Sequence, residues 1–114
     1  FAAYRELLGE LPGLTFMPEA DYNHATHWLT VVQIDAEKFG ATPDEVRLAL
    51  EQENIEARPV WKPMHLQPVF AECRVRGGAV SERLFNRGLC LPSGSAMTEK
   101  DIRRVVACVK KCVR

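Results

Sequence analysis

The sequence has 114 residues, the length of a single domain that can bury about two thirds of its unfolded surface. Fifteen Lys and Arg residues balance fifteen Asp and Glu residues, so no net charge attracts nucleic acid or an anionic membrane. Hydrophobic residues make up 46% of the chain, yet no apolar run reaches the ~18 residues that a membrane span needs. These values exclude a membrane-spanning protein and predict one soluble globular domain.

The amino-terminal segment predicts a helix whose apolar pattern is already under way at the first residue. The chain starts at Phe1 without an initiator Met, and Arg5 and Glu6 interrupt the apolar stretch that a signal peptide would need. We therefore expect an upstream region that this sequence does not contain. The apolar residues that recur at helical spacing are Phe1, Tyr4, Leu7, Leu8 and Leu11.

Two strands are predicted in the first third of the chain. Residues 14–17 follow the breaker Pro-Gly and form a short strand, and residues 19–27 form a polar loop. Residues 28–34, WLTVVQI, are β-branched, aromatic and almost uninterrupted in apolar character, which is typical of a central strand. We expect Trp28 to lie in the core.

The clearest helix start is the T-P-D-E run at residues 42–45. The Thr hydroxyl caps the free amides, Pro fits the first helical position and Glu completes a capping box. Asn54 suits the end of this helix. A strand over residues 55–61 is predicted next, and Pro59 keeps it near a sheet edge because proline cannot donate to a ladder. Residues 65–70 predict a short turn or helix.

The last third of the chain predicts a helix over residues 80–87 that Gly88 stops, a brief strand over residues 89–91 and a final helix capped by Thr98. One face of the final helix carries an apolar stripe for packing on a sheet: Ile102, Val105, Val106, Val109 and Val113. The opposite face carries a basic cluster, interpreted as a solvated helix face: Arg103, Arg104, Lys110, Lys111 and Arg114. The whole pattern predicts an α+β fold, with one small sheet of about three to four strands packed with helices.

The cysteines and histidines predict neither a disulfide framework nor a metal site. Cys108 and Cys112 lie one helical turn apart and Cys90 lies in an apolar run, so each of the four cysteines, including Cys73, is read as a buried reduced thiol of a cytoplasmic protein. No C-x-x-C pair accompanies the three histidines. The run LPSGS at residues 91–95 lacks the G-x-S-x-G pattern of a nucleophile elbow.

The densest group of chemically versatile side chains lies in ARPVWKPMHLQPVF, residues 57–70. Prolines fix the backbone there and hold neighbouring side chains in place, among them Arg58, Trp61, Lys62 and His65. Arg and Lys can bind anions, Trp offers a flat apolar face and His can donate or accept a hydrogen bond. Composition leaves two readings open: a stiff connector whose Trp packs in the core, or a preformed binding surface.

The runs RPVWKPMHLQPVF and SERLFNRGLCLPSGSAMTEKDI, with WLTVVQID and the T-P-D-E helix, resemble the C-terminal domain of the DegT/DnrJ/EryC1/StrS family of sugar aminotransferases. Within the family they look most like enzymes that make UDP-4-amino-4,6-dideoxy-N-acetylglucosamine, a bacillosamine-type precursor. The resemblance implies the small domain of a fold-type I transferase that depends on pyridoxal phosphate. It also implies transfer of an amino group, from glutamate, to the C4 ketone of a UDP-linked 4-keto-6-deoxy amino sugar.

The same resemblance implies how the chemistry is divided. None of the five lysines stands in the family's cofactor-lysine context, so we expect no catalytic residue here and no cofactor bound by residues 1–114 alone. His65 is placed nearest the nucleotide sugar, Trp61 and Lys62 on the same wall, and Arg58 at the strand end. The implied partners are an N-terminal large domain, a second subunit of a homodimer and the nucleotide sugar.

Two other readings remain at this point. The chain could be a stand-alone, non-enzymatic α+β binding or regulatory module, or an interaction domain whose basic last helix binds an acidic partner in a salt-sensitive way. If the large domain exists, its docking face should appear as an exposed apolar patch involving the first helix, Trp61 and Met64.

Overall fold

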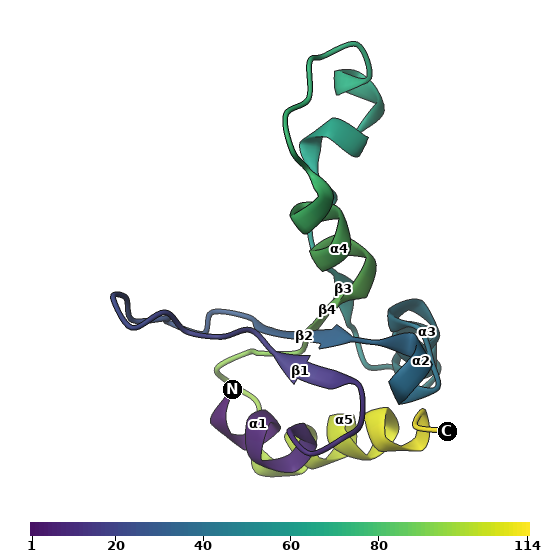
Figure 1. Cartoon of the computed structure of the whole chain (residues 1–114). Helices are drawn as coiled ribbons and strands as arrows, with labels where there is room; N and C mark the ends of the chain where they lie inside the picture. Colours follow the sequence, from purple (N-terminus) through teal and green to yellow (C-terminus); the bar gives the residue numbers. More distant parts are fainter.

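The computed structural model describes residues 1–114 and contains a four-stranded antiparallel sheet in the order β1-β2-β4-β3. The strands are β1 (Leu14–Phe16), β2 (Thr30–Ile34), β3 (Arg58–Pro59) and β4 (Gly88–Leu91). Helices cover one face of this sheet, and two segments project away from the body (Figure 1). The α+β fold is therefore confirmed.

Helices α1 (Ala2–Leu8), α3 (Pro43–Gln52) and α5 (Glu99–Lys111) enclose the core with one face of the sheet. Figure 1 shows α1 and α5 lying together beneath the strands. A single turn, α2 (Ala36–Phe39), follows β2 and was not expected from the sequence. It places Phe39 in the core, fully buried. Seventeen buried residues form one continuous cluster, so the body has a core of its own.

The capping box expected at Thr42 is present, and the cap expected at Thr98 is also a capping box. The hydroxyl of Thr42 accepts a hydrogen bond from the backbone N–H of Glu45, and the Glu45 carboxylate accepts one from the backbone N–H of Thr42 at 2.7 Å. Thr98 and Asp101 repeat the arrangement at the start of α5. Local sequence therefore fixes where these two helices begin.

The two faces of the sheet follow the alternation of side chains along a strand. Thr30, Val32 and Ile34 of β2 are buried against the helices. Residues between them point to the opposite face, where cross-strand pairing puts Val31, Cys90 and Arg58 in one row. We call this opposite side the open face. The expected positions of a central β2 and an edge strand at Pro59 are both confirmed.

Residues 61–87 form a projecting arm. It contains two single-turn 3-10 helices, η1 (Met64–Leu66) and η2 (Pro68–Phe70), and the helix α4 (Ala79–Arg87). No residue of the arm is buried. The radius of gyration is 15.1 Å, compared with about 13 Å for a compact domain of this length, which reflects the arm and the projecting loop 17–29. The expected short helix near residues 65–70 and the expected helix ending before Gly88 are confirmed.

Several expectations need correction. Strand β2 starts at Thr30, because no partner strand pairs with the preceding residues, and Trp28 is 73% exposed instead of lying in the core. The strand expected over residues 55–61 is only Arg58–Pro59. The first helix contributes no large exposed apolar side chain, because Tyr4 and Leu8 are buried in the core.

The four cysteines are unpaired, as expected, but only Cys90 and Cys108 are buried. Cys112 is half-buried and Cys73 is exposed on the arm, so the reading of every cysteine as a buried small hydrophobe is wrong for Cys73. The basic side chains of the last helix are exposed, which confirms the solvated face.

No helix in the structure combines the length and the apolar character needed to cross a membrane.

Candidate functional site

A hollow of about 600 Å³ lies on the open face, which we call the sheet hollow. It forms where the base of the arm meets β3 and the loop that follows β4. Its walls come from segments far apart in the sequence, so only the folded sheet assembles it. Its lining includes Leu29, Arg58, Trp61, Cys90, Ser93 and Met97.

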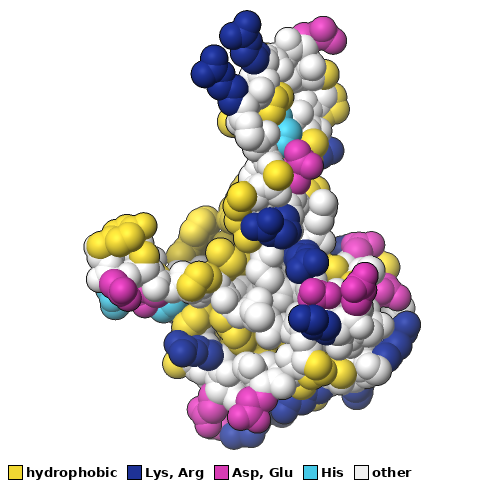
Figure 2. All heavy atoms as spheres, in the orientation of Figure 1, with side chains coloured by type: hydrophobic (Ala, Val, Ile, Leu, Met, Phe, Trp, Pro, Cys, Tyr) yellow, Lys and Arg dark blue, Asp and Glu magenta, His cyan; other side chains and the backbone are white.

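A second hollow of about 400 Å³ adjoins the first and shares Leu29 and Trp61 with it. Trp28 lines the second hollow, and its ring centroid lies 6.1 Å from that of Trp61 at a tilt of 35°. Both rings are mostly exposed, 73% for Trp28 and 68% for Trp61. Figure 2 shows hydrophobic side chains gathered where the arm leaves the body. We call the two tryptophans the aromatic pair.

The polar side chains beneath the sheet hollow form hydrogen bonds to the backbone of the chain. The hydroxyl of Ser93 accepts from the backbone N–H of Thr30 at 2.8 Å and donates to the carbonyl of Leu91 at 2.9 Å. Tyr4 donates to the carbonyl of Pro92 at 3.0 Å, and burial raises the pKa of Tyr4 to about 12. Burial also raises the pKa of the Cys90 thiol, which disfavours a thiolate nucleophile. The floor of the hollow is therefore rigid and offers no activated nucleophile.

Arg58 stands at the rim of the sheet hollow with its side chain 76% exposed. Its Nε donates to Oε1 of Glu56 at 2.6 Å. The guanidinium has five N–H donors, so this one carboxylate leaves donors for a ligand. These free donors are available to hydrogen-bond an anionic ligand, although Glu56, which also lines the sheet hollow, offsets the positive charge of Arg58.

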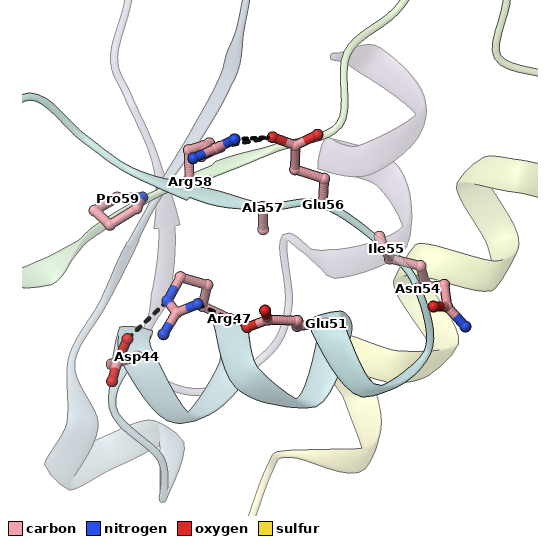
Figure 3. A pocket seen from close by; sticks show the side chains of 9 residues that line it. All are labelled: Asp44, Arg47, Glu51, Asn54, Ile55, Glu56, Ala57, Arg58 and Pro59. Atoms are coloured by element: carbon pink, nitrogen blue, oxygen red, sulfur yellow. Dashed lines mark hydrogen bonds and ion pairs between the residues drawn. The ribbon is translucent and has the colours of Figure 1, made fainter.

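Another hollow, of about 760 Å³, lies between α3 and β3 (Figure 3). Its cations already have acidic partners within the chain. Arg47 donates to Asp44 at 2.8 Å and to Glu51 at 2.9 Å, and Arg58 pairs with Glu56. The lining has three acidic and two basic side chains, so the hollow has no preference for an anionic ligand, and we do not assign a site there.

The other two predicted site residues lie farther along the arm. His65 is 19% exposed, and its Nε2 lies 2.8 Å from Oε1 of Glu82 on α4. Lys62 is exposed, and its backbone carbonyl accepts from Nε2 of Gln67 at 3.0 Å. The structure thus brings Arg58 and Trp61 together in the sheet hollow, whereas Lys62 and His65 do not line it.

The structure contains no cluster of metal-ligating side chains and no enclosed lysine. No group of three or more His, Cys, Asp or Glu side chains is placed to hold a metal ion. All five lysines are exposed and none lines either hollow of the open face. A Schiff-base lysine needs an enclosed pocket that lowers its pKa, so these lysines do not fit that role for pyridoxal phosphate.

Sequence reasoning missed two participants. Trp28 was assigned to the core, and it has the parity of Thr30, Val32 and Ile34, which face the helices. It lies two residues before the first paired residue of β2, so the alternation of the strand does not reach it. Glu82 was not singled out at all. Its contact with His65 joins residues 17 apart across an irregular segment, and no periodic pattern signals such a contact.

Comparison with known proteins identifies the fold and the family. Residues 1–110 match the DegT/DnrJ/EryC1/StrS aminotransferase family. The chain belongs to this family. EpsN of Bacillus subtilis, assigned as a pyridoxal phosphate-dependent aminotransferase, is 44% identical over 110 residues. GDP-perosamine synthase of Caulobacter vibrioides is 36% identical over 80 residues, covering 70% of this chain and 21% of that protein.

Among solved structures, DesI, crystallised in the presence of its TDP-sugar product, superimposes with a TM-score of 0.84 at 33% identity. TlmJ from Streptoalloteichus hindustanus has a TM-score of 0.81 at 22% identity and supports the fold alone. The match to EpsN includes 93% of the present chain but only 28% of EpsN. The match to DesI includes 29% of DesI. The chain therefore spans under a third of these relatives.

Proposed function

We propose that residues 1–114 are the C-terminal small domain of a pyridoxal phosphate-dependent sugar aminotransferase. The enzyme would transfer an amino group from glutamate to the C4 ketone of a UDP-linked 4-keto-6-deoxy amino sugar, as in bacillosamine-type biosynthesis. The family match and the 44% identity to EpsN support this proposal. The four unpaired cysteines agree with action in the cytoplasm.

When bound, pyridoxal phosphate would act as the electron sink for amino transfer. The lysine that carries it is expected in an N-terminal large domain, because the lysines of this chain are exposed and lie outside the hollows. This domain would then supply recognition and not covalent chemistry.

The observation that carries the proposal is the open face with its aromatic pair. Two tryptophans, mostly exposed and 6.1 Å apart, border adjoining hollows at the base of an arm that has no core. Exposed apolar patches of this kind mark interfaces or ligand grooves. We propose that the large domain and a second subunit cover part of this face and leave the rest as a wall of the substrate site.

Each predicted site residue would have a distinct role, Arg58 and Trp61 in this wall and Lys62 and His65 on the arm outside the sheet hollow. Trp61 would pack on the nucleotide sugar, and Arg58 would use its free donors for the diphosphate. Lys62, exposed beside Trp61, would add a mobile positive charge. His65, held on the arm, would donate to or accept from the substrate.

The role of His65 is tested by His65→Ala in the protein that contains this domain together with its large domain. Loss of one charge-assisted contact should lower kcat/KM for the UDP-linked keto sugar by about ten- to a hundredfold. His24→Ala is the matched control, because that side chain is 92% exposed on the projecting loop. An unchanged kcat/KM in His65→Ala would remove His65 from the site.

The assignment as an enzyme is tested separately on the unmutated protein that contains this domain together with its large domain. We expect the visible absorbance of lysine-bound pyridoxal phosphate and consumption of glutamate when the keto sugar is added. Absence of both would reject the aminotransferase and favour a stand-alone binding module.

A further inference from the structure

Glu82 and His65 connect the two ends of the arm. His65 lies in η1, Glu82 lies in the first turn of α4, and Nε2 of the ring is 2.8 Å from Oε1 of the carboxylate. The ring is 19% exposed and the carboxylate 43%, so the contact is partly shielded from solvent. A shielded charged hydrogen bond holds its donor in place better than a fully exposed one does.

The chemistry of this contact settles which ring nitrogen remains available. An ionised carboxylate only accepts hydrogen bonds, so Nε2 of His65 must carry the hydrogen that it donates to Glu82. No hydrogen bond within the chain uses Nδ1. Nδ1 can therefore accept from a hydroxyl when the ring is neutral and donate to an oxyanion when the ring is protonated.

Gly78 completes the support of the ring. It begins α4 with a φ of 111°, a conformation that favours glycine. A Cβ at this position would lie 2.9 Å from Nε2 and 3.0 Å from Cε1 of His65. The missing side chain thus leaves the space in which the His65 ring meets Glu82.

We propose that Glu82 is a positioning residue, which fixes the His65 ring so that Nδ1 faces the nucleotide sugar, with Gly78 providing the room. This inference rests on the proposed function, because it presupposes that His65 meets the substrate. It adds that recognition depends on a hydrogen-bonded pair spanning the arm and not on the histidine alone.

Kinetics of the intact enzyme with the UDP-linked keto sugar test the pair. Glu82→Ala should lower kcat/KM on the order of tenfold, and should add nothing in the His65→Ala background, because groups in direct contact are not additive. Glu82→Gln keeps an acceptor oxygen and should recover most of the loss. Glu72→Ala, an exposed acidic residue of the same arm, should leave kcat/KM unchanged.

A structural role alone predicts a different result. An acidic side chain in the first turn of a helix stabilises it through its charge, so Gln would then fail as Ala does and the loss would appear in the melting temperature. Equal losses for Glu82→Gln and Glu82→Ala, or additivity with His65→Ala, would overturn the proposal. A His65→Ala variant without effect would instead reject the role of His65 in the proposed function, and the inference with it.

An NMR measurement, which needs no enzyme activity, distinguishes a positioning role of Glu82 from a purely structural one. In NMR spectra of the 114-residue chain, the Nε2-bound proton of His65 should be protected from exchange with water and visible, and Glu82→Ala should abolish its signal. Gly78→Ala should weaken the signal by displacing the ring. If the proton were equally visible in Glu82→Ala, the contact would not hold the ring and the proposal would fail whatever the kinetics show.

Discussion

The body of the domain and its arm are held together in different ways. In the body, seventeen buried residues from strands and helices form one core, and α3 and α5 each begin with a capping box. In the arm no residue is buried, and α4 begins at Gly78 without a side-chain cap. The difference indicates that the body folds on its own buried contacts, whereas the arm is held within this chain by a few polar links and by partly exposed contacts.

The largest expected effect is a difference in stability between Leu→Ala substitutions in the body and in the arm. Leu50 on α3 is fully buried, and Leu50→Ala should lower the free energy of unfolding by about 2–5 kcal/mol. Leu66 in the arm is 37% exposed, and Leu66→Ala should cost less than about 1 kcal/mol. Urea unfolding of the chain measures both values. Leu48→Ala, also on α3 but 43% exposed, controls for helix propensity. Equal costs for Leu50 and Leu66 would mean that the arm shares the core.

A smaller effect tests the helix starts of the body. Thr42→Ala and Thr98→Ala should each cost about 0.5–2 kcal/mol at neutral pH, because each removes a cap. The arm helix has no equivalent cap to lose. Thr26→Ala, in the exposed loop, is the control.

The cost of removing these caps should also depend on pH. The backbone N–H of Thr42, and then its hydroxyl, lower the pKa of Glu45, and the hydroxyl and then the N–H of Thr98 lower the pKa of Asp101. A lowered pKa in the folded state stabilises the fold above the ordinary carboxyl pKa, and this stabilisation is lost as the pH falls through the folded value. The gap between wild type and each variant should therefore narrow below about pH 4. A gap that stays constant with pH would show that the hydrogen bonds between these hydroxyls and the carboxylates contribute nothing.

The contrast between body and arm also explains what the sequence could predict. The cap at Thr42 and the strand character of β2 are local, so T-P-D-E and WLTVVQI were sufficient to predict them. The residue at which β2 starts is determined by contacts with a distant part of the chain. The backbone N–H of Thr30 is held by the Ser93 hydroxyl, 63 residues away, and pairing with Leu91 starts there, which leaves Trp28 outside the strand.

The candidate site shows the same limit. The residues from Arg58 to His65 stood out through their chemistry and their prolines, but their sequence proximity did not reveal that only Arg58 and Trp61 share a hollow. The partner of His65 lies on α4, beyond an irregular segment in which neither a period of 2 nor one of 3.6 applies. Contacts of this kind require the folded chain.

The smallest expected effect concerns the ion pair that joins the arm to the body. Nη1 of Arg87, at the end of α4, lies 3.2 Å from a carboxylate oxygen of Asp35, which follows β2. Because Arg87 is 48% exposed, Arg87→Ala should cost only about 0.2–1 kcal/mol, and 1 M salt should reduce that cost. A double-mutant cycle with Asp35→Ala in urea measures the coupling, and Arg83→Ala on the same helix is the control. A coupling well above 1 kcal/mol would show that the arm is fastened to the body more firmly than the exposure of Arg87 indicates.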